Sequence, residues 1–466
     1  MNEIRASEDV NDSHMTAKGG NEDYRVSLIS LGCAKNLVNS EQMSYLLTEA
    51  GYSLSADIEG AHTVIVNTCA FIDAAKTEAI DTILKLGEMK KEGSVGNIMI
   101  AGCLAQKYKD EIFVELPEVD AILGVGSFDR VAEAVEKTAR TRGKVKIFDT
   151  LRGPVSEAKR IVSTPPAWSY LKIADGCDNR CAYCVIPDIR GPYRSRPIGN
   201  IVDEARELAE RGTSEIIVIA QDVTRYGHDA FSKSDITVLL NTLCEIEKLK
   251  WIRLHYLYPD EITDELIDVI RESGKILKYL DIPIQHISDK ILRGMNRRGS
   301  GDDIRRLIKK LRERIPGVVI RTSIITGLPG EGEEEFEELC DFLREFRIER
   351  AGIFAYSPQD GTEAAMMSRP DTETAESRAE ILAELQSRIM DDFCESRIGK
   401  IETVLIEGFE DECAYGRSFA ESPEIDGYIK VRFGEKNGRG RLAEQSAFIE
   451  VRITGAENGE PVGEPI

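Results

Sequence analysis

Residues 169–184 read SYLKIADGCDNRCAYC, a strand-like apolar run followed at once by three closely spaced cysteines. Similar runs, separated by amphipathic helical stretches, recur at 215–222, 251–257, 278–285, 319–327 and 350–357. Successive βα units build a parallel sheet, so the six repeats predict a partial (βα)6 barrel of the TIM type, two repeats short of a complete one. The functional site of such a barrel lies at the carboxyl ends of its strands, where the three cysteines stand.

Three earlier apolar runs also end in a cysteine. They read RVSLISLGC, HTVIVNTC and NIMIAGC, and they end at Cys33, Cys69 and Cys103. The intervals of 36 and 34 residues each match about one βα unit, which predicts an open parallel α/β domain. Because the carboxyl ends of parallel strands share one edge, we expect these cysteines to converge on one spot. Buried cysteines at strand ends are common, so a purely structural interpretation stays open at this point.

Two further segments of the chain differ from these repeats in composition and expected secondary structure. Gly, Ser and Pro without periodicity indicate a linker, and short strands with turns near the end predict a small antiparallel β-barrel, one strand of it at 438–445. The predicted divisions are a disordered tail at 1–22, an N-terminal domain at 23–150, the linker at 151–166, the central core at 167–396, the β-barrel at 397–454 and a frayed tail at 455–466.

Composition narrows the class of protein. Sixty Lys and Arg stand against 82 Asp and Glu, which gives a net charge of −22 and disfavours polyanions such as nucleic acid or anionic lipid as partners. No stretch approaches the ~20 apolar residues that cross a membrane, and the first residues lack an apolar signal segment, so we expect a cytoplasmic protein. Ten cysteines in that compartment indicate metal or redox chemistry rather than disulfides.

Cys177, Cys181 and Cys184, called the loop cysteines below, form a CxxxCxxC motif. The motif supplies three thiolates and no obvious fourth ligand, whereas closed structural zinc sites need four. A [4Fe-4S] cluster held by three cysteines leaves one iron open to a small molecule. A zinc loop with a remote fourth ligand is the alternative.

With an aromatic residue, Tyr183, before its last cysteine, this motif resembles that of the radical S-adenosylmethionine (SAM) superfamily. The resemblance implies that the open iron binds S-adenosylmethionine. It further implies that one electron passed into the sulfonium releases a 5′-deoxyadenosyl radical.

The strings SLGCAKN, VNTCAF and AGCLAQ around Cys33, Cys69 and Cys103 resemble the N-terminal domain of the methylthiotransferases. That resemblance implies that these three residues, the auxiliary cysteines, hold a second [4Fe-4S] cluster whose open iron carries the inserted sulfur. It also implies that two S-adenosylmethionine molecules are used per turnover.

Within that family, SLGCAKNLVNSE, GCDNRCAYCVIPDIRG, PIQHISDKILRGMNRRG and GRSFAESPEIDG resemble the branch that modifies an aspartate of the small-subunit ribosomal protein S-twelve. Two departures from the branch pattern, Asn39 and the pair Glu331 and Gly332, touch no cluster ligand. The implied reaction is methylthiolation of the aspartate β-carbon. The implied partners are this basic protein or the ribosome, a low-potential electron donor such as flavodoxin or ferredoxin, and a sulfur donor.

By the same resemblance, five residues are candidates for cofactor binding: Tyr183 in the cysteine loop, Gln221, Asp222 and Gln285 at predicted strand ends, and Gly327 in a turn that opens a helix. Ordinary strand-end hydrogen bonding is the alternative for each of the polar ones. No residue is assigned as a protein acid or base. The segment RGPYRSRP contains Arg190, Arg194 and Arg196. These arginines are suited to bind an anionic group of a substrate or cofactor, and a solvated surface is an equal alternative.

The C-terminal module resembles a TRAM domain, which binds nucleic acid in relatives that act on tRNA. Here residues 397–466 carry nine Lys or Arg against fourteen Asp or Glu, a poor surface for phosphate and a suitable one for a basic protein. Two alternatives stay open. A tRNA adenosine methylthiotransferase would share every cluster ligand. A non-catalytic electron carrier would not need a partial barrel, and it would usually have four cysteines for each cluster.

Overall fold

The computed structural model describes residues 23–466 except 142, 232–234, 411–412, 434–445 and 458. The predicted disordered tail at 1–22 and the strand predicted at 438–445 therefore lie outside the described residues. The chain forms two compact units. The first comprises Met1–Thr164, Ala174–Arg180 and Cys184–Arg196, and the second comprises Pro165–Ile173, Cys181–Tyr183 and Pro197–Ile466.

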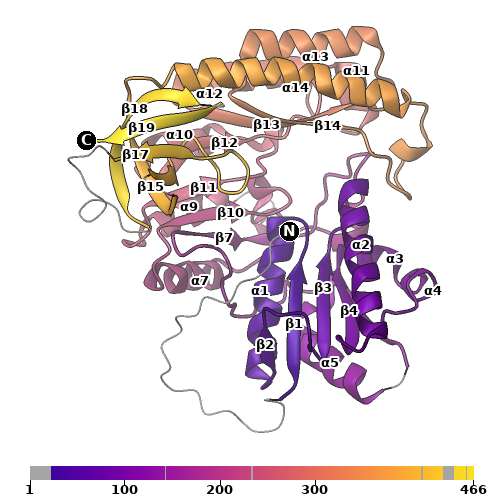
Figure 1. Ribbon diagram of the computed structural model, residues 1–466. Coiled ribbons are helices and arrows are strands. Elements are labelled where there is room, and N and C mark those ends of the chain that lie inside the picture. Colours follow the sequence, from indigo (N-terminus) through magenta and orange to yellow (C-terminus); the bar gives the residue numbers. More distant parts are fainter. Residues whose placement is uncertain (1–22, 142, 232–234, 411–412, 434–445, 458) are drawn as a thin grey trace. The chain divides into compact units, whose positions relative to one another are not determined.

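The first unit contains a six-stranded, wholly parallel sheet in the order β2-β1-β3-β4-β5-β6 (Figure 1). Its strands are β1 (Arg25–Ser30), β2 (Ser53–Ser55), β3 (Thr63–Thr68), β4 (Asn97–Gly102), β5 (Ala121–Leu123) and β6 (Val145–Ile147). The three central strands are the apolar runs that precede the auxiliary cysteines. The prediction of an open parallel α/β domain is thus confirmed.

Helices cover both faces of this sheet. They are α1 (Ala34–Glu49), α2 (Asp73–Lys91), α3 (Cys103–Tyr108), α4 (Glu111–Glu115), η1 (Val125–Arg130), α5 (Val131–Arg140) and α6 (Ile186–Arg190), and a short ribbon of β8 (Ala174–Asp175) and β9 (Arg194–Ser195) completes the unit. Residues of α1 and α5 pack on one face and residues of α2, α3 and α6 on the other, around two separate apolar clusters. Burial on both faces explains why the central strands are almost uniformly apolar.

The second unit contains the other parallel sheet, in the order β14-β13-β12-β11-β10-β7. Its strands are β7 (Trp168–Lys172), β10 (Glu215–Ile219), β11 (Trp251–Leu254), β12 (Ile276–Asp281), β13 (Val319–Thr326) and β14 (Arg350–Ala355). All six coincide with the runs predicted from the sequence, and the sheet neighbours follow chain order. The partial (βα)6 barrel is confirmed.

The helices of this unit are η2 (Val223–Arg225), α7 (Ile198–Glu210), α8 (His228–Phe231), α9 (Ile236–Cys244), η3 (Pro259–Glu261), α10 (Asp264–Glu272), α11 (Asp289–Gly294), α12 (Gly301–Arg314), α13 (Glu333–Phe346), η4 (Ala364–Met366) and α14 (Thr372–Glu395). Side chains that accept hydrogen bonds from the first turn cap several of them, such as Thr263 for α10 and Asp371 for α14. In the described parts of the chain, no helix combines the length and apolarity that a membrane crossing requires.

The C-terminal module closes into a five-stranded barrel in the order β15-β16-β17-β19-β18. The strands are β15 (Ile401–Glu410), β16 (Cys413–Arg417), β17 (Ile429–Arg432), β18 (Phe448–Glu457) and β19 (Glu460–Pro465). The prediction that residues 455–466 fray is wrong, because β18 extends to Glu457 and β19 pairs with both β18 and β17. Closure of the barrel removes the two edges that an open sheet would leave.

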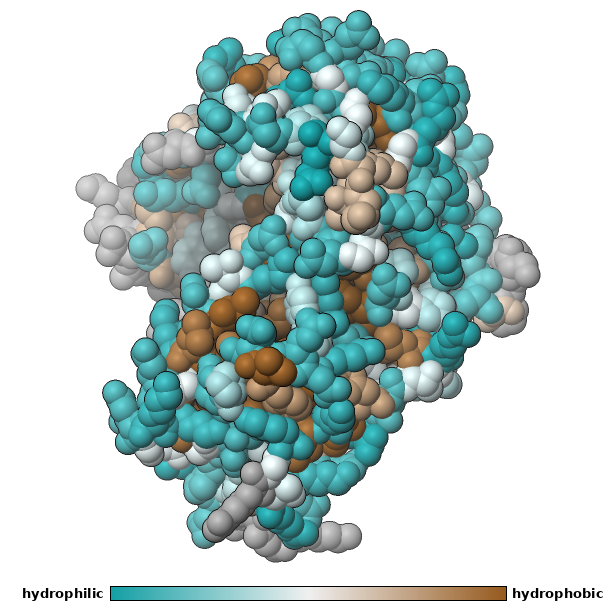
Figure 2. Space-filling model, turned by 90° about the vertical axis from the view of Figure 1, so that its right-hand side faces the viewer, coloured by the Kyte–Doolittle hydropathy of each residue, from teal (hydrophilic) through white to brown (hydrophobic). Residues whose placement is uncertain are grey.

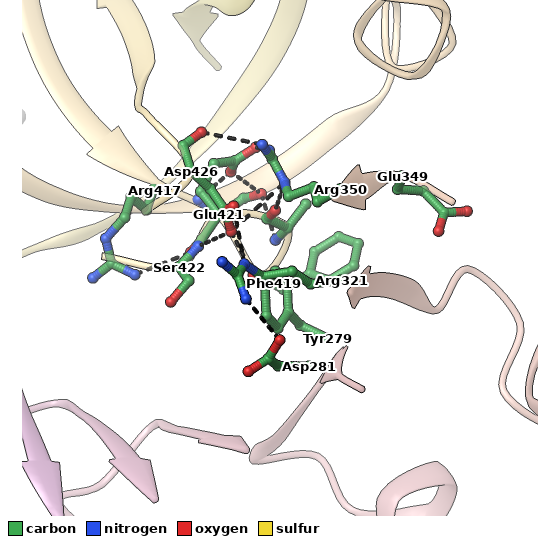
Figure 3. Close-up of polar contacts among 12 residues, drawn as sticks. Tyr279, Asp281, Arg321, Glu349, Arg350, Arg417, Phe419, Glu421, Ser422 and Asp426 are labelled. Atoms are coloured by element: carbon green, nitrogen blue, oxygen red, sulfur yellow. Dashed lines mark hydrogen bonds and ion pairs between the residues drawn. The ribbon is translucent and has the colours of Figure 1, made fainter. Parts of the chain in front are cut away.

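A network of buried ion pairs joins this module to the β10–β14 sheet (Figure 3). Glu215 at the start of β10 accepts hydrogen bonds from Nη2 of Arg417 (2.7 Å) and Nε of Arg253 (2.7 Å), and all three side chains are fully buried. Arg350 on β14 donates to Oε1 of Glu421 (3.0 Å). Because neighbouring arginines hold the pKa of Glu421 at about 2 despite its burial, this carboxylate stays ionised at neutral pH.

We expect Arg417→Met to destabilise the second unit by about 3–5 kcal/mol, because removal of one partner leaves the Glu407 and Glu215 carboxylates buried with fewer counter-charges. Urea unfolding followed by tryptophan fluorescence measures this, since both tryptophans of the chain lie in strands of this unit. Arg432→Met is the matched control. Arg432 pairs with Glu457 at a half-exposed site, so its loss should cost less than about 1 kcal/mol. Equal losses in the two variants would contradict a desolvated network.

Candidate functional site

The auxiliary cysteines each follow one of three adjacent strands of the first unit. Cys33 lies at the N-cap of α1 after β1, Cys69 follows β3, and Cys103 begins α3 after β4. A Cβ atom on Gly32, whose φ of +93° is left-handed, would come within 2.6 Å of the Cβ of Cys69. The sheet edge therefore gathers the three residues, as the sequence predicts, and leaves no room for a side chain between the first two.

The three thiols share one electrostatic environment. Burial, together with the neighbouring Cys103 and Cys33, raises the pKa of Cys69 to about 12. Burial also raises the pKa of Cys103. The pKa of Cys33 is lowered overall, because Lys35, Arg190 and backbone amides of α1 outweigh the effect of its burial. The three thiols therefore lie near one another at the carboxyl edge of the sheet.

Asn36 on α1 fixes all three cysteine-bearing loops. Its Nδ2 donates to the carbonyl of Thr68 (2.8 Å), just before Cys69, and to the carbonyl of Leu31 (3.3 Å). Its Oδ1 lies 3.8 Å from the sulfur of Cys103. Hydrogen bonds to the backbone beside a binding residue hold that residue in place. We therefore expect Asn36 to position the auxiliary cysteines.

Three thiols are the ligand set of a [4Fe-4S] cluster with one open iron, so the residue types of this set fit such a cluster. Across the residues that the structure describes, no three His, Cys, Asp or Glu side chains are arranged around one ion position. A cluster distributes three thiolates over three different irons, so its ligands need not meet at one point. No disulfide links the cysteines among the described residues.

The loop cysteines lie between β8 and α6, in a segment without helix or strand. The amide of Cys177 donates to the carbonyl of Gly191 (3.1 Å). A Cβ atom on Gly176 would lie 2.0 Å from the carbonyl oxygen of Pro192, so only glycine fits before the first loop cysteine. In the second unit, the guanidinium of Arg297 contacts the sulfur of Cys181 (3.9 Å) and the hydroxyl of Tyr183 (3.3 Å).

The remaining predicted cofactor residues lie at the carboxyl ends of barrel strands. Gln221 and Asp222 follow β10, and Asp222 accepts a hydrogen bond from the amide of Thr224 (3.1 Å) at the start of η2. Asp222 thus has a capping role, as the alternative interpretation allowed. Its assignment to cofactor binding, like that of Gln221, remains a prediction.

Gln285 and Gly327 follow β12 and β13. Gln285 has a left-handed φ of +70° and forms an isolated parallel β-bridge with Ile324 of β13. The amide of Gly327 donates to the buried Glu331 (2.9 Å), whose other carboxylate oxygen accepts from Arg378 (2.8 Å). The Nε2 atom of His286 lies 3.3 Å from the Glu331 carboxylate. This carboxylate fixes the turn after β13 against the end of β12.

Of three further residues at the cysteines, the sequence analysis missed Asn36 and Arg297 and left the role of Arg190 open. Asn36 and Arg297 lie inside strings that carry the family resemblance but have no residue type that signals chemistry. Arg190 belongs to RGPYRSRP, for which a solvated face was an equal alternative, yet its side chain is only 1% exposed. The signal that would have distinguished it is its place on a helix that packs against the cysteine-bearing edge.

Apolar side chains are exposed close to the auxiliary cysteines. The chain passes from the buried Cys69 to Phe71 and Ile72, which are exposed, and Ile80 and Leu84 are exposed on α2. Figure 2 looks onto the side of the molecule where α2 and α4 lie in Figure 1 and shows apolar surface gathered there. Exposed apolar side chains therefore follow Cys69 in the chain and continue along α2.

Three family models match successive parts of the chain. Residues 25–124 match one described as uncharacterized protein family UPF0004, residues 171–343 match the radical SAM superfamily, and residues 398–466 match the TRAM domain. The fold and the cysteine motif thus define a radical SAM protein. Membership of that superfamily implies a [4Fe-4S] cluster and S-adenosylmethionine.

Curated relatives match over nearly the whole chain. The ribosomal protein uS12 methylthiotransferase RimO of Caldanaerobacter subterraneus subsp. tengcongensis is 45% identical over 440 residues, covering 94% of this chain and 99% of the relative. The protein of the same name from Lachnoclostridium phytofermentans is 44% identical over 442 residues, covering 94% and 99%. The chain belongs to the ribosomal protein uS12 methylthiotransferase RimO family.

Among solved structures, the radical S-adenosylmethionine methyltransferase TsrM from Kitasatospora setae, with cobalamin and a [4Fe-4S] cluster bound, is similar with a TM-score of 0.54. The two chains are 13% identical, and the match covers 82% of this chain and 77% of that one. The likeness is one of fold.

We expect Gly32→Ala to lower the iron bound at the auxiliary cysteines, where the sequence predicts a cluster, because the added methyl group displaces Cys69. Iron analysis after anaerobic reconstitution measures this. Gly93→Ala is the matched control, since Gly93 has a similar φ of +82° but nothing within 4 Å of its added Cβ. It carries only the left-handed strain of about 1–2 kcal/mol and should bind iron like the parent. Full iron content in Gly32→Ala would contradict the packing argument.

Proposed function

We propose that this chain replaces a β-hydrogen of an aspartate in ribosomal protein uS12 with a methylthio group, by radical SAM chemistry. The near full-length identity to RimO proteins supports this substrate. The observation that carries the proposal is the presence of two separate sets of three cysteines. One set lies in the loop after the first strands of the radical SAM region, and the other is gathered at the carboxyl edge of the N-terminal sheet.

Each set has its own role in the proposal. The loop cysteines hold one [4Fe-4S] cluster and the auxiliary cysteines hold a second, as their shared environment supports. When bound, these clusters and two S-adenosylmethionine molecules per turnover supply the radical, the sulfur and the methyl group. The protein binds and orients the groups and excludes water. Tyr183, Gln221, Asp222, Gln285 and Gly327 contribute to the cofactor site.

The reaction also requires partners that we propose by class. A low-potential donor such as flavodoxin or ferredoxin supplies electrons, and a sulfur donor replenishes the auxiliary cluster. The ribosomal protein, free or within the ribosome, is the substrate. We place the reaction in the cytoplasm, where this substrate is made.

Charge in the C-terminal barrel favours the protein substrate over tRNA. Residues 397–466 contain more acidic than basic side chains. Two of their arginines, Arg397 and Arg417, are buried in ion pairs with Glu402 and Glu407, so they do not present charge to phosphate. A surface of this kind complements a basic ribosomal protein.

Deletion of the gene should remove the methylthio group from the aspartate of uS12 and leave tRNA nucleosides unchanged. Mass spectrometry of ribosomal proteins and of digested tRNA from the same cells measures both. Complementation with the intact gene is the positive control. A missing methylthio-adenosine in tRNA, with uS12 unaltered, would favour the tRNA alternative instead.

The two cysteine sets should separate two activities. A variant with all three auxiliary cysteines changed to Ala should still form 5′-deoxyadenosine from S-adenosylmethionine but insert no sulfur, because radical formation belongs to the loop cysteines. The matched variant with all three loop cysteines changed to Ala should form none. Product analysis by liquid chromatography distinguishes them. Loss of 5′-deoxyadenosine in the first variant, with its remaining cluster intact by spectroscopy, would contradict this division.

A further inference from the structure

Arg190 places a buried positive charge against the auxiliary cysteines. It ends α6, and its Nη2 lies 3.7 Å from the sulfur of Cys103 and donates to Oδ1 of Asn36 (2.6 Å). Its Nη1 donates to both carboxylate oxygens of Asp175 (3.0 and 3.2 Å). All these residues belong to the first unit.

The guanidinium of Arg190 therefore contacts one auxiliary cysteine and also forms an ion pair next to the loop cysteines. Asp175 stands two residues before Cys177, the first of the loop cysteines, and also accepts a hydrogen bond from the amide of Gly176 (2.9 Å). A guanidinium is always protonated in proteins, and the side chain of Arg190 is only 1% exposed, so it carries its charge where water screens it poorly.

We propose that Arg190 raises the reduction potential of the auxiliary cluster and that Asp175 opposes it, so that this ion pair sets the potential at which the cluster accepts an electron. The inference deepens the proposed function and rests on the auxiliary cysteines holding a [4Fe-4S] cluster. In the step concerned, one electron from an external reductant enters the cluster, and no bond is formed or broken.

The direction in which each residue shifts the reduction potential follows from electrostatics. Reduction adds a negative charge to the cluster, and a nearby buried cation stabilises the reduced form more than the oxidised form. Hydrogen bonding from the guanidinium to a ligating sulfur acts in the same direction. A carboxylate beside the guanidinium cancels part of this effect, so Asp175 lowers the potential.

Neighbouring arginines of the same segment do not share this geometry. Arg196 is also buried, but it forms its ion pair with Glu157, and its Nε donates to both carboxylate oxygens (2.9 Å each). Arg194 donates to backbone carbonyls, including that of Arg190 (2.8 Å). Arg196 therefore provides a matched control for removal of a buried arginine from this segment.

The test is a potentiometric titration, followed by electron paramagnetic resonance, of the full chain with the three loop cysteines changed to Ala. Only the auxiliary cluster remains in that background. Arg190→Gln should shift its midpoint potential to a more negative value, and Asp175→Asn should shift it to a more positive value. Arg190→Lys, which keeps the charge, and Arg196→Gln should stay near the parent.

Opposite shifts cannot arise from general damage to the site, which would move both variants alike. Unchanged potentials, or shifts of the same sign for Arg190→Gln and Asp175→Asn, would overturn the inference. Loss of iron from both Arg190→Gln and Arg190→Lys would also overturn it, since lysine retains the positive charge. A background that binds no iron at all would instead refute the auxiliary cluster and thus the proposed function.

Discussion

Parallel strands place all of their carboxyl ends along one edge of a sheet, and the site of this protein depends on that constraint. In the first unit, β1, β3 and β4 are neighbours, so the residues that follow them meet although they are more than thirty positions apart in the chain. In the second unit, the same rule gathers the polar residues that follow β10, β12 and β13. In each unit a parallel sheet thus gathers, at one edge, residues from short motifs that are far apart in the chain.

Buried charge is the second organising feature. Arg190 and Arg297 each bring a guanidinium to a cysteine, the first at Cys103 and the second at Cys181. Thiolates and reduced clusters are negative, so a desolvated cation beside them compensates charge that water would otherwise solvate. In the C-terminal module, buried charge has a structural role instead, because the ion pair of Arg417 and Glu215 joins the β-barrel to the partial (βα)6 barrel.

The strands β1, β3 and β4 and the cysteines after them were predictable because apolar runs of similar spacing each end in a cysteine. The six strands of the second parallel sheet were predictable because apolar runs alternate with helical patterns there, whereas the short strands β2, β5 and β6 were not predicted. The strand β19 was missed because EPVGEP contains two prolines and no alternation of apolar and polar residues. It forms through pairing with β17 and β18, which only the closed barrel provides. Asn36 was missed because its contacts join segments that are distant in the chain. The role of Arg190 stayed open because an arginine in a polar run has the same pattern as a surface residue.

We propose that the chain holds two [4Fe-4S] clusters, each on its own three cysteines. Mössbauer spectroscopy combined with iron and sulfide analysis of the anaerobically reconstituted intact chain is the decisive experiment. It should show two cubane clusters with about eight irons and eight sulfides per chain, because each three-cysteine set binds four irons. A single cluster with about four irons, or tightly bound zinc in place of iron at either set, would contradict it.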